Sequence, residues 1–508
     1  MLPGRRYHPY DKGVSLAVKV RRREIESHAR WHLSMPQLWA LVAVVLPIVA
    51  ALASHMSTVD LAYHLRAGAG ILSTHSLPRV DTYTFTVAGR PWLDQQWGAQ
   101  VLLEVAYRLG GWATLAFTRA AMVGAIFFLV YRACRLGGAS IRQSATLTIA
   151  SFLVATPGLG LRPQLFAMVL FAFTLWILAR RPAHPTGLLA IPPIVAVWAN
   201  LHGSFFLPLL LLGIAWLQDR KEPGTRAHRL LSVGAASVLA TLANPFGLHV
   251  WAYVVNISRN PDIMRFVTEW QPPTIRTYGG AAFFLSLALT ALFLARRSTP
   301  TPWPTLIGIG VFCLIALDAQ RGVTWWAFAV PVLIAGLLPT PTRQEPDRET
   351  HSLLNVSIAA ALVLVGIVYL PWWRAEDTAG GASSLLRDDP TGITRELQAI
   401  ATPGDRIFNA QIWGSWIEFS LPQTKVAVDS RIEIFPASVW QVYGDVSAGR
   451  QGWQQDLDRW GVQLIVADRE QQDRLIPLLA GDPSWRLVYA DADGAIYERA
   501  SPDPPSNP

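Results

Sequence analysis

Long apolar stretches alternate with polar connections along most of the chain. Eleven of these stretches are expected to form helices in a membrane: 38–53, 113–131, 144–157, 164–179, 188–199, 205–217, 230–243, 281–295, 305–317, 323–338 and 353–370. Several are shorter than the roughly 20 residues that a straight span needs. For 188–199 and 205–217 two interpretations remain open, two short helices or one re-entrant pair. The pattern predicts an α-helical polytopic membrane protein with about 11 spans.

The polar connections fall into two alternating classes. One class is short and basic; it comprises the segment 1–34 together with Arg132, Arg135, Arg180, Arg181, Arg220, Lys221, Arg226, Arg229, Arg296, Arg297, Arg343 and Arg348. Such loops face the cytoplasm in membrane proteins. The other class is longer, is richer in Trp and Pro and carries most of the acidic residues, so it is expected to face outward. The N-terminus is then inside, and the chain after residue 370 is outside.

The outward regions also suggest how the chain divides into domains. The expected order is a cytoplasmic segment 1–34, a transmembrane domain 35–371 with outer loops 56–111 and 244–280, a Gly-rich linker 372–384, a small extracytoplasmic α/β domain 385–500 and a disordered tail 501–508. The α/β assignment depends on short β-like runs with helical patterns between some of them. The runs are 406–408, 425–428, 462–466, 486–490 and 495–498, and the helical patterns are 451–460 and 471–480.

Composition supports the membrane assignment. The 508 residues are 51% hydrophobic and 15% charged, whereas a soluble chain carries roughly 25% charged residues. The basic connections explain the net charge of +8 better than nucleic-acid binding does, and the lipid bilayer is the expected partner. Cys134 and Cys313 lie near or inside apolar stretches, so we expect buried thiols and neither a disulfide framework nor a zinc site.

The first outer loop begins with an acid and an imidazole near the membrane edge. Asp60 and His64 are four residues apart, so they share a face if the segment is helical. Two interpretations of Asp60 remain open. It is either a solvated interfacial acid, or a carboxylate at the mouth of an outward cavity. In the second case it would remove a proton from an acceptor hydroxyl or hold a divalent cation.

Further along the same loop, carboxylates lie among aromatic residues. Asp81 follows Pro78, and a turn or cap role is as compatible with this position as a substrate contact. Asp94 lies between Trp92 and Trp97, a combination that suits sugars because carboxylates accept from hydroxyls while indoles pack on C–H faces. Trp is also common at any membrane interface, so both interpretations remain open.

Polar residues also mark the outward ends of later spans. Arg162, His202 and Arg321 are placed where buried polar groups are costly and often functional, and the two arginines suit a phosphate head group. Their alternative role is mutual hydrogen bonding or snorkelling. Glu269 is the acid of the second outer loop that we expect to complete a site begun by Asp60. For Asp429 and Arg431 we favour an internal ion pair that packs the C-terminal domain on the membrane part over a ligand site.

Several stretches together resemble a known class of membrane proteins. They are DLAYHLRAGAGILSTHSLPRVDTYTFTVAGRPWLDQQW, VWANLHGSF, LANPFGLHVWAY, TEWQPPT, NAQIWGSWIEF and VAVDSRIEIFP. Over nearly its whole length the chain is similar to bacterial polytopic proteins of GT-C glycosyltransferase type, which share their architecture with protein mannosyltransferases and oligosaccharyltransferases. The resemblance implies a bacterial inner-membrane location, a polyprenyl-phosphate-linked sugar as donor and an essential acid just beyond the first span, at Asp60.

The chain departs from those relatives at two places. Protein mannosyltransferases have an adjacent Asp-Glu pair, whereas Leu61 follows Asp60 here. Oligosaccharyltransferases carry Trp-Trp-Asp in the soluble domain, whereas Trp372 and Trp373 precede Arg374 at the membrane edge. Transfer to asparagine is therefore not predicted.

Three functional hypotheses follow. The first is a membrane glycosyltransferase acting on the outer face; its catalytic residues would be Asp60, His64 and Glu269, and its substrate-binding residues would be Asp81, Asp94, Trp97, Arg162, His202 and Arg321. A divalent metal ion, if used, would bind Asp60. The second is a lipid-linked saccharide transporter or flippase, and the third is a non-catalytic envelope protein. The sequence contains no P-loop, GxGxxG, HExxH, GxSxG or CxxC signature, which argues against an ATP-driven pump and against standard hydrolases. The sugar, the acceptor and the oligomeric state stay open.

Overall fold

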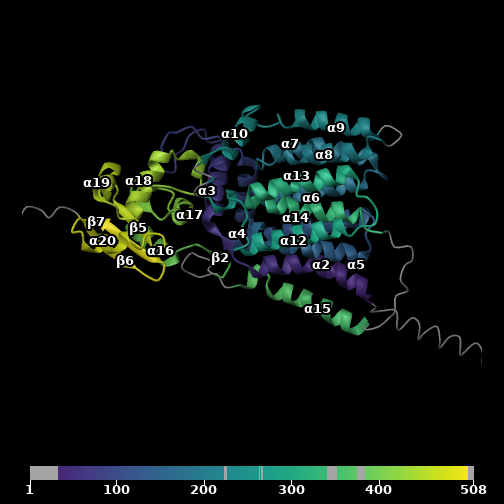
Figure 1. Ribbon diagram of the computed structural model, residues 1–508. Coiled ribbons are helices and arrows are strands. Elements are labelled where there is room, and N and C mark those ends of the chain that lie inside the picture. The colour runs from purple at the N-terminus through teal and green to yellow at the C-terminus, as the bar shows by residue number, and fades with distance from the viewer. Residues whose placement is uncertain are drawn as a thin grey trace, which may run out of the picture.

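A computed structural model describes residues 33–221, 226–261, 264, 267–339, 352–374 and 384–500. All but the last two residues of the expected cytoplasmic segment 1–34 lie outside this part of the chain, as do most of the linker 372–384 and the tail 501–508. The described chain is mostly helical. A bundle of helices forms one part, and the C-terminal region lies at one end of it (Figure 1).

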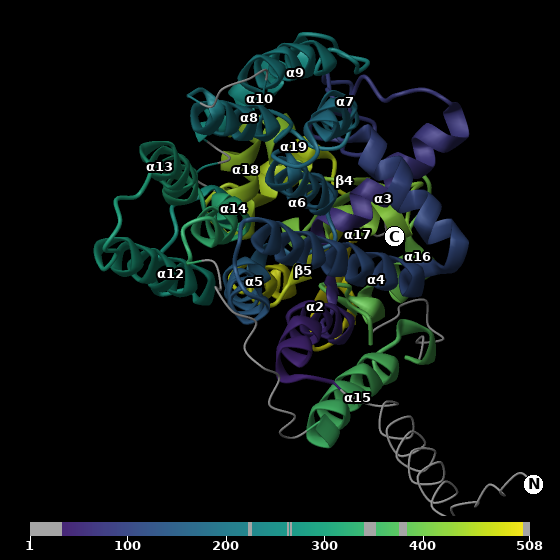
Figure 2. The same ribbon diagram turned by 90° about the vertical axis from the view of Figure 1, so that its right-hand side faces the viewer.

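Each of the eleven apolar stretches contains a helix. They are α2 (Met35–Ala53), α4 (Trp97–Leu136), α5 (Ile141–Ala155), α6 (Pro163–Arg180), α7 (Ile191–Ala199), α8 (Leu207–Asp219), α9 (Arg226–Ala240), α12 (Tyr278–Ala295), α13 (Trp303–Asp318), α14 (Val323–Ala335) and α15 (Ser352–Val368). Among the described helices, α2, α4, α6 and α12 are long and apolar enough to cross a membrane. The protein is a multi-pass membrane protein, and the count of eleven spans stays a prediction. End-on, α4 and α6 lie near the centre, and α9, α12 and α15 lie at the periphery (Figure 2).

Helix α4 contains the boundary between the first outer loop and the second apolar stretch. Its backbone leaves the helical conformation at Gly110 and Gly111, and Gly111 has φ +61° and ψ −150°. Residues with a side chain rarely adopt this conformation, so glycine is required there. The break separates residues 97–109, which belong to the predicted outer loop, from residues 112–136, which contain the predicted span.

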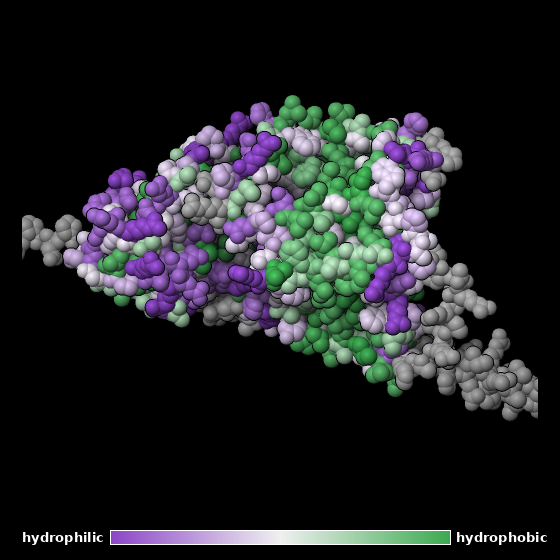
Figure 3. All heavy atoms as spheres, viewed as in Figure 1, coloured by the Kyte–Doolittle hydropathy of each residue, from purple (hydrophilic) through white to green (hydrophobic). Residues whose placement is uncertain are grey.

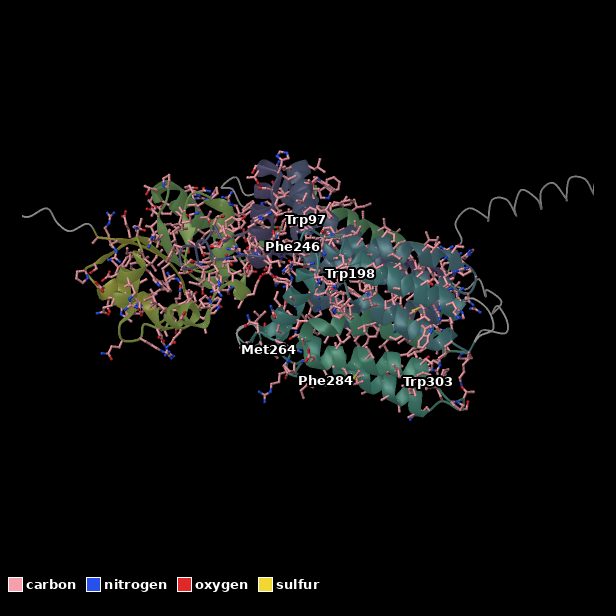
Figure 4. All side chains as sticks on the ribbon, turned by 90° about the horizontal axis from the view of Figure 1, so that it is seen from above. Trp97, Trp198, Phe246, Met264, Phe284 and Trp303 are labelled. Carbon is pink, nitrogen blue, oxygen red and sulfur yellow. The ribbon has the colours of Figure 1, made fainter. Side chains whose placement is uncertain are left out.

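The basic helix ends gather at one end of the bundle. Arg181, after α6, donates to Asp219 at the end of α8 at 2.9 Å. The next residue, Arg220, stacks over the ring of Trp303 at the start of α13, 4.6 Å from its centroid. Trp303 lies at the end remote from the C-terminal region, whereas Trp97 lies at the junction with it (Figure 4). An apolar band separates these two polar ends (Figure 3). The described basic connections at Arg181 and Arg220 therefore share one face, as the charge alternation predicted. The segment 1–32, Arg343 and Arg348 lie outside the described residues, and the side of the membrane that this face meets remains a prediction.

The C-terminal region contains a five-stranded mixed sheet with helices on both faces. Its strands, in the order β4-β3-β5-β7-β6, are β3 (Arg406–Asn409), β4 (Lys425–Val426), β5 (Leu464–Asp468), β6 (Trp485–Ala490) and β7 (Gly494–Arg499). Along β5, Leu464 and Val466 pack on one face and Ile465 and Ala467 on the other, as the two-residue period of a strand requires. Helices α16 (Thr391–Ile400) and α17 (Gln411–Ser420) cover the first face; α18 (Ala437–Ser447), α19 (Trp453–Trp460) and α20 (Leu475–Gly481) cover the second.

The first outer loop packs into this C-terminal region. Strand β1 (Met56–Ser57) pairs in parallel with β2 (Leu386–Arg387). The backbone N–H of Phe85 donates to the carbonyl of Val426 at 3.1 Å, so the loop covers the edge strand β4. Trp92 of the same loop is buried in one core with residues of the sheet. The loop and the C-terminal region therefore form a single packed unit above the bundle.

Candidate functional site

Helix α3 (Thr58–Thr74) places Asp60 directly above the bundle. The hydroxyl of Ser57, the residue before the helix, donates to the Asp388 carboxylate at 2.7 Å. The hydroxyl of Thr58 donates to the carbonyl of Asp388 at 2.8 Å, which fixes the start of α3 to the C-terminal region. Asp60 lies in the first turn, where the helix dipole stabilises a negative charge.

Four predicted residues from four separate segments meet at this point. Arg162 Nη1 donates to Asp60 Oδ2 at 2.9 Å and to Glu269 Oε2 at 3.0 Å. Arg162 Nη2 donates to Glu269 Oε1 at 2.6 Å, so Glu269 binds the guanidinium through both of its oxygens. Arg321 Nη2 reaches Glu269 Oε2 at the longer distance of 3.4 Å. The sequence predicted these residues as members of one site, and the structure brings them into contact.

The charges in this cluster balance. Burial raises the pKa of Glu269, but Arg162 and Arg321 outweigh it and hold the pKa below its ordinary value. Burial lowers the pKa of Arg162, and Glu269 and Asp60 reverse this, so that its pKa lies above the ordinary value. Glu269 and Arg162 therefore stabilise each other in their charged forms. The side chains of Asp60, Arg162 and Glu269 are 29%, 23% and 33% exposed, so a ligand can reach them.

A pocket of about 50 Å³ adjoins the two arginines at the membrane side. Its lining includes Arg162, which directly precedes α6, Gly279 in the first turn of α12, and Thr324 in the first turn of α14. Helix N-termini carry partial positive charge and favour anions. Three helix N-termini and two guanidinium groups therefore converge on one pocket, an arrangement suited to a phosphate.

Arg321 is the arginine with spare hydrogen-bonding capacity. Its guanidinium stacks on the ring of Trp270, 4.4 Å from the centroid. Its Nε is buried and has no hydrogen-bond partner among the described residues. Trp270 was not among the predicted residues, although it directly follows Glu269. Stacking on an indole orients a guanidinium without using its N–H groups, which leaves them for a ligand.

The two predicted histidines lie beside this cluster and are neutral. Burial lowers the pKa of His64 well below its ordinary value, and the charge of Arg162 lowers it further. Burial, Arg321 and Arg162 lower the pKa of His202 to about 3. The Nδ1 atom of His202 lies 2.8 Å from the hydroxyl of Ser204. Both imidazoles can therefore take part in hydrogen bonds without adding charge next to the arginines.

Asp94 lies deeper than the arginine cluster. It is 3% exposed, and its Oδ1 accepts from the Gln100 amide at 2.7 Å. Its Oδ2 is buried with no hydrogen-bond partner in the described part of the chain. Burial raises the pKa of Asp94 to about 7, against the opposing effects of Gln100 and Arg431. The neighbouring Trp97 donates to Asn200 Oδ1 at 3.0 Å and lines a separate apolar pocket of about 590 Å³.

This buried carboxylate predicts a distinct pH dependence of stability. The pKa of Asp94 in the folded protein lies above its ordinary value of 3.8. Asp94 therefore stabilises the fold fully below about pH 3.8, and this stabilisation is lost as the pH rises through about 7. Asp94→Asn cannot ionise. Between about pH 5 and about pH 8 we expect wild type to lose about 2–3 kcal/mol more stability than Asp94→Asn. Thermal unfolding of both proteins across this range measures the difference, and parallel curves would contradict it.

Asp81 lies in a buried ionic cluster and not in the Arg162 cluster. Its Oδ2 accepts from the hydroxyl of Thr84 at 2.7 Å, and its Oδ1 accepts from Arg431 at 2.7 Å. Arg431 also donates from Nε to Asp429 at 2.9 Å. Burial and Asp429 raise the pKa of Glu418, which lies 3.9 Å from Arg431, well above its ordinary value. The geometry favours the turn interpretation of Asp81 and agrees with an internal Asp429–Arg431 pair.

The arrangement around Asp60 does not resemble a metal site. Among the described residues no group of three or more His, Cys, Asp or Glu side chains is placed to hold a metal ion. Asp60 and Glu269 both bind the Arg162 guanidinium, so a divalent cation would have to displace a cation that is already bridging them. The residues present do not fit a resident metal, and no step is assigned to one.

Comparisons with known proteins place this geometry in a wider context. No protein-family model matches the sequence, and no curated protein matches it at a significant level. The oligosaccharyltransferase AglB of Archaeoglobus fulgidus, solved with an inhibitory peptide and a dolichol-phosphate, matches with a TM-score of 0.51 at 12% identity, over 92% of this chain and 74% of that chain. ArnT of Cupriavidus metallidurans bound to undecaprenyl phosphate matches with a TM-score of 0.50 at 13% identity, over 90% and 97%.

A third match has a different length. The arabinofuranosyltransferase AftD from Mycobacteria has a TM-score of 0.56 at 17% identity, over 93% of this chain and 42% of that chain. These structural neighbours are GT-C glycosyltransferases. This chain has a GT-C-like fold. At these identities the likeness is one of fold, and the GT-C-like fold by itself assigns no reaction. The function of the chain depends on the residues that it places around Asp60.

Proposed function

We propose that this protein is a membrane glycosyltransferase that moves a sugar from a polyprenyl-phosphate-linked donor to an acceptor at the outer face of the bacterial inner membrane. The observation that supports it most is the convergence of Arg162, Arg321 and three helix N-termini on one pocket beside an accessible carboxylate. Two proteins with a similar fold were solved with dolichol-phosphate or undecaprenyl phosphate. A lipid-borne phosphate is therefore the anion that this site suits.

In this proposal the arginines bind the phosphate, and Asp60 acts on the acceptor. The phosphate enters at the membrane side and takes over the N–H groups of Arg321 and part of those of Arg162, with Glu269 as the counter-ion that it displaces. Positive charge at this point stabilises the leaving phosphate as the sugar–oxygen bond breaks. Asp60 Oδ1, which accepts no hydrogen bond among the described residues, then removes the proton from the acceptor hydroxyl as that oxygen attacks the sugar.

Binding of undecaprenyl phosphate to the purified protein tests this function. We expect Arg321→Met to weaken binding about 10–100-fold, because a charge-assisted hydrogen bond to phosphate contributes about 1.5–3 kcal/mol. Arg321 is preferred to Arg162 for this test because its contact with Glu269 is longer, so its loss disturbs the free protein less. Fluorescence titration in detergent micelles gives the dissociation constants.

The control variant is Arg90→Met, which removes an exposed arginine of the first outer loop. It should leave the affinity unchanged. Undecaprenol, which has the same chain without the phosphate, should bind much more weakly than undecaprenyl phosphate. Equal affinities of Arg321→Met and Arg90→Met, or equal binding of the two lipids by wild type, would overturn the proposal.

A further inference from the structure

One acid of the C-terminal region reaches toward the membrane part. Glu433 lies in the 3-10 turn η6 (Ile432–Ile434), whose Ile432 and Ile434 are buried, whereas Glu433 is only half-buried. The hydroxyl of Tyr253, in α10 (His249–Ser258) of the second outer loop, faces Glu433 Oε1 at 3.5 Å. This distance is longer than a good O–H···O hydrogen bond, so both groups keep the capacity to bind a third one.

Glu433 and Asp60 are electrostatic neighbours although 373 positions separate them in the sequence (433 minus 60). Burial raises the pKa of Glu433, and the Asp429 and Asp60 carboxylates add to this effect, against its own backbone N–H and Arg431. Burial and Glu433 raise the pKa of Tyr253 strongly. Arg321 is close enough to Tyr253 to oppose part of this rise. Glu433 and Tyr253 therefore lie within electrostatic range of Asp60 and Arg321.

Tyr63 adds an aromatic side chain to this border. It lies three residues after Asp60 on α3, so the two share a helix face. Burial raises its pKa, and the Glu433, Asp60 and Asp94 carboxylates raise it further. Tyr63 is half-buried, and its ring packs against His64 with centroids 4.0 Å apart. Residues from both outer loops and from the C-terminal region thus lie close together beside Asp60.

A buried acid with one unpartnered oxygen lies near these groups as well. Burial and other carboxylates are the larger causes of the raised pKa of Tyr63 and of Tyr253, and Asp94 raises both further. Asp94 therefore lies near both hydroxyls. It is 3% exposed, and its Oδ2 has no hydrogen-bond partner within the described residues. Buried polar atoms in proteins are generally satisfied, so this atom indicates a place where a hydroxyl-bearing ligand or water completes the network.

The chemistry of these groups fits a sugar. Tyrosine rings pack against the C–H face of a pyranose or furanose, while their hydroxyls bind its polar edge. A carboxyl oxygen accepts a hydrogen bond from a sugar hydroxyl, and a tyrosine hydroxyl can both donate and accept one.

We propose that Glu433, Tyr253 and Tyr63 bind the sugar of the lipid-linked donor, and that the C-terminal region thereby forms one wall of the catalytic site. This inference rests on the proposed function. The phosphate is held by Arg162 and Arg321, and the sugar extends from it toward Glu433, so that its anomeric carbon lies near Asp60. The residues of this wall bind and orient the sugar, and they exchange no proton with it.

Binding of paired lipids to the full-length protein tests the sugar wall. The probes are bare undecaprenyl phosphate and the same lipid carrying mannose, glucose, arabinose or 4-amino-arabinose. For wild type we expect at least one of these sugars to increase affinity about tenfold or more over the bare lipid. Glu433→Ala and Tyr253→Phe should each remove most of this increase and leave the affinity for bare undecaprenyl phosphate unchanged. Glu470→Ala, an exposed acid of the same region, should change neither.

The outcomes separate this inference from the proposed function. If wild type binds bare undecaprenyl phosphate but the sugar adds nothing, or if Glu433→Ala and Tyr253→Phe both keep the full sugar-dependent increase, the sugar wall is wrong and the phosphate site stands. Failure of wild type to bind bare undecaprenyl phosphate removes the proposed function and this inference together. Because Tyr253 and Glu433 come from different segments, misfolding of one variant does not decide the result.

Discussion

Asp60→Asn is expected to lower the rate of sugar transfer by about 10²–10⁴-fold, the usual contribution of a positioned general base. Asparagine has the same size and can still accept the hydrogen bond from Arg162, so the cluster should keep its geometry. The amide cannot take a proton from an acceptor hydroxyl. Transfer is measured as loss of labelled sugar from undecaprenyl-phosphate-linked donors by the purified protein in liposomes that contain bacterial envelope lipids.

Two comparisons make the result interpretable. Asp473→Asn, which changes an exposed acid of the C-terminal region, should transfer at the wild-type rate. Asp60→Asn should also bind undecaprenyl phosphate at least as well as wild type, since it removes a negative charge beside the phosphate. A transporter or a non-catalytic envelope protein has no need of this proton acceptor. Full transfer activity in Asp60→Asn would therefore remove the catalytic role of this residue.

Arg431→Met should cost about 3–5 kcal/mol of folding free energy, the cost of breaking a buried ion pair. The Arg431 side chain is 0% exposed, and it neutralises Asp81 and Asp429, which are 1% and 0% exposed. It also stacks against Tyr83 and Trp92, at 4.8 and 4.6 Å from their centroids. Without it two carboxylates remain buried between the first outer loop and the sheet. A lower unfolding temperature and loss of monodisperse protein in detergent would show the effect.

A matched variant and a rescue test the origin of this loss. Arg450→Met removes an arginine that pairs with Asp445 at the surface, and its effect should be small because exposed pairs contribute little. Asp81→Asn added to Arg431→Met removes one of the uncompensated charges and should recover part of the stability. If Arg431→Met unfolds at the same temperature as Arg450→Met, the cluster does not hold the loop on the C-terminal region.

The parts of the site that were predictable have local signals. Asp60, Arg162, Glu269 and Arg321 each lie at the outward end of an apolar stretch or in an outer loop, and charge alternation identifies which ends share a face. Polar residues at that end of a helix bundle avoid the lipid, so they are expected to lie near one another. Hydropathy and charge alternation together therefore placed four contacting residues on one face, although they gave no distances and no pairing among them.

The rest of the site depends on packing between distant segments. Asp81 and Arg431 are 350 residues apart in the sequence, and no local pattern indicates that they form an ion pair. Glu433 is one acid in a short stretch of isoleucines, and only the turn η6 directs it away from the core. The five strands had local β-like signals. Helix α17 had no helical signal in the sequence, because both of its faces are covered. Its Trp413 and Trp416 pack on different sides.

The position of a bound lipid phosphate tests the central claim most directly. Cryo-electron microscopy of the protein in nanodiscs with undecaprenyl phosphate should place the phosphorus within hydrogen-bonding reach of the Arg162 and Arg321 guanidinium groups, next to Asp60 and at the N-termini of α6, α12 and α14. Phosphate density at the opposite end of the bundle, among Arg181, Arg220 and Arg297, would contradict the account.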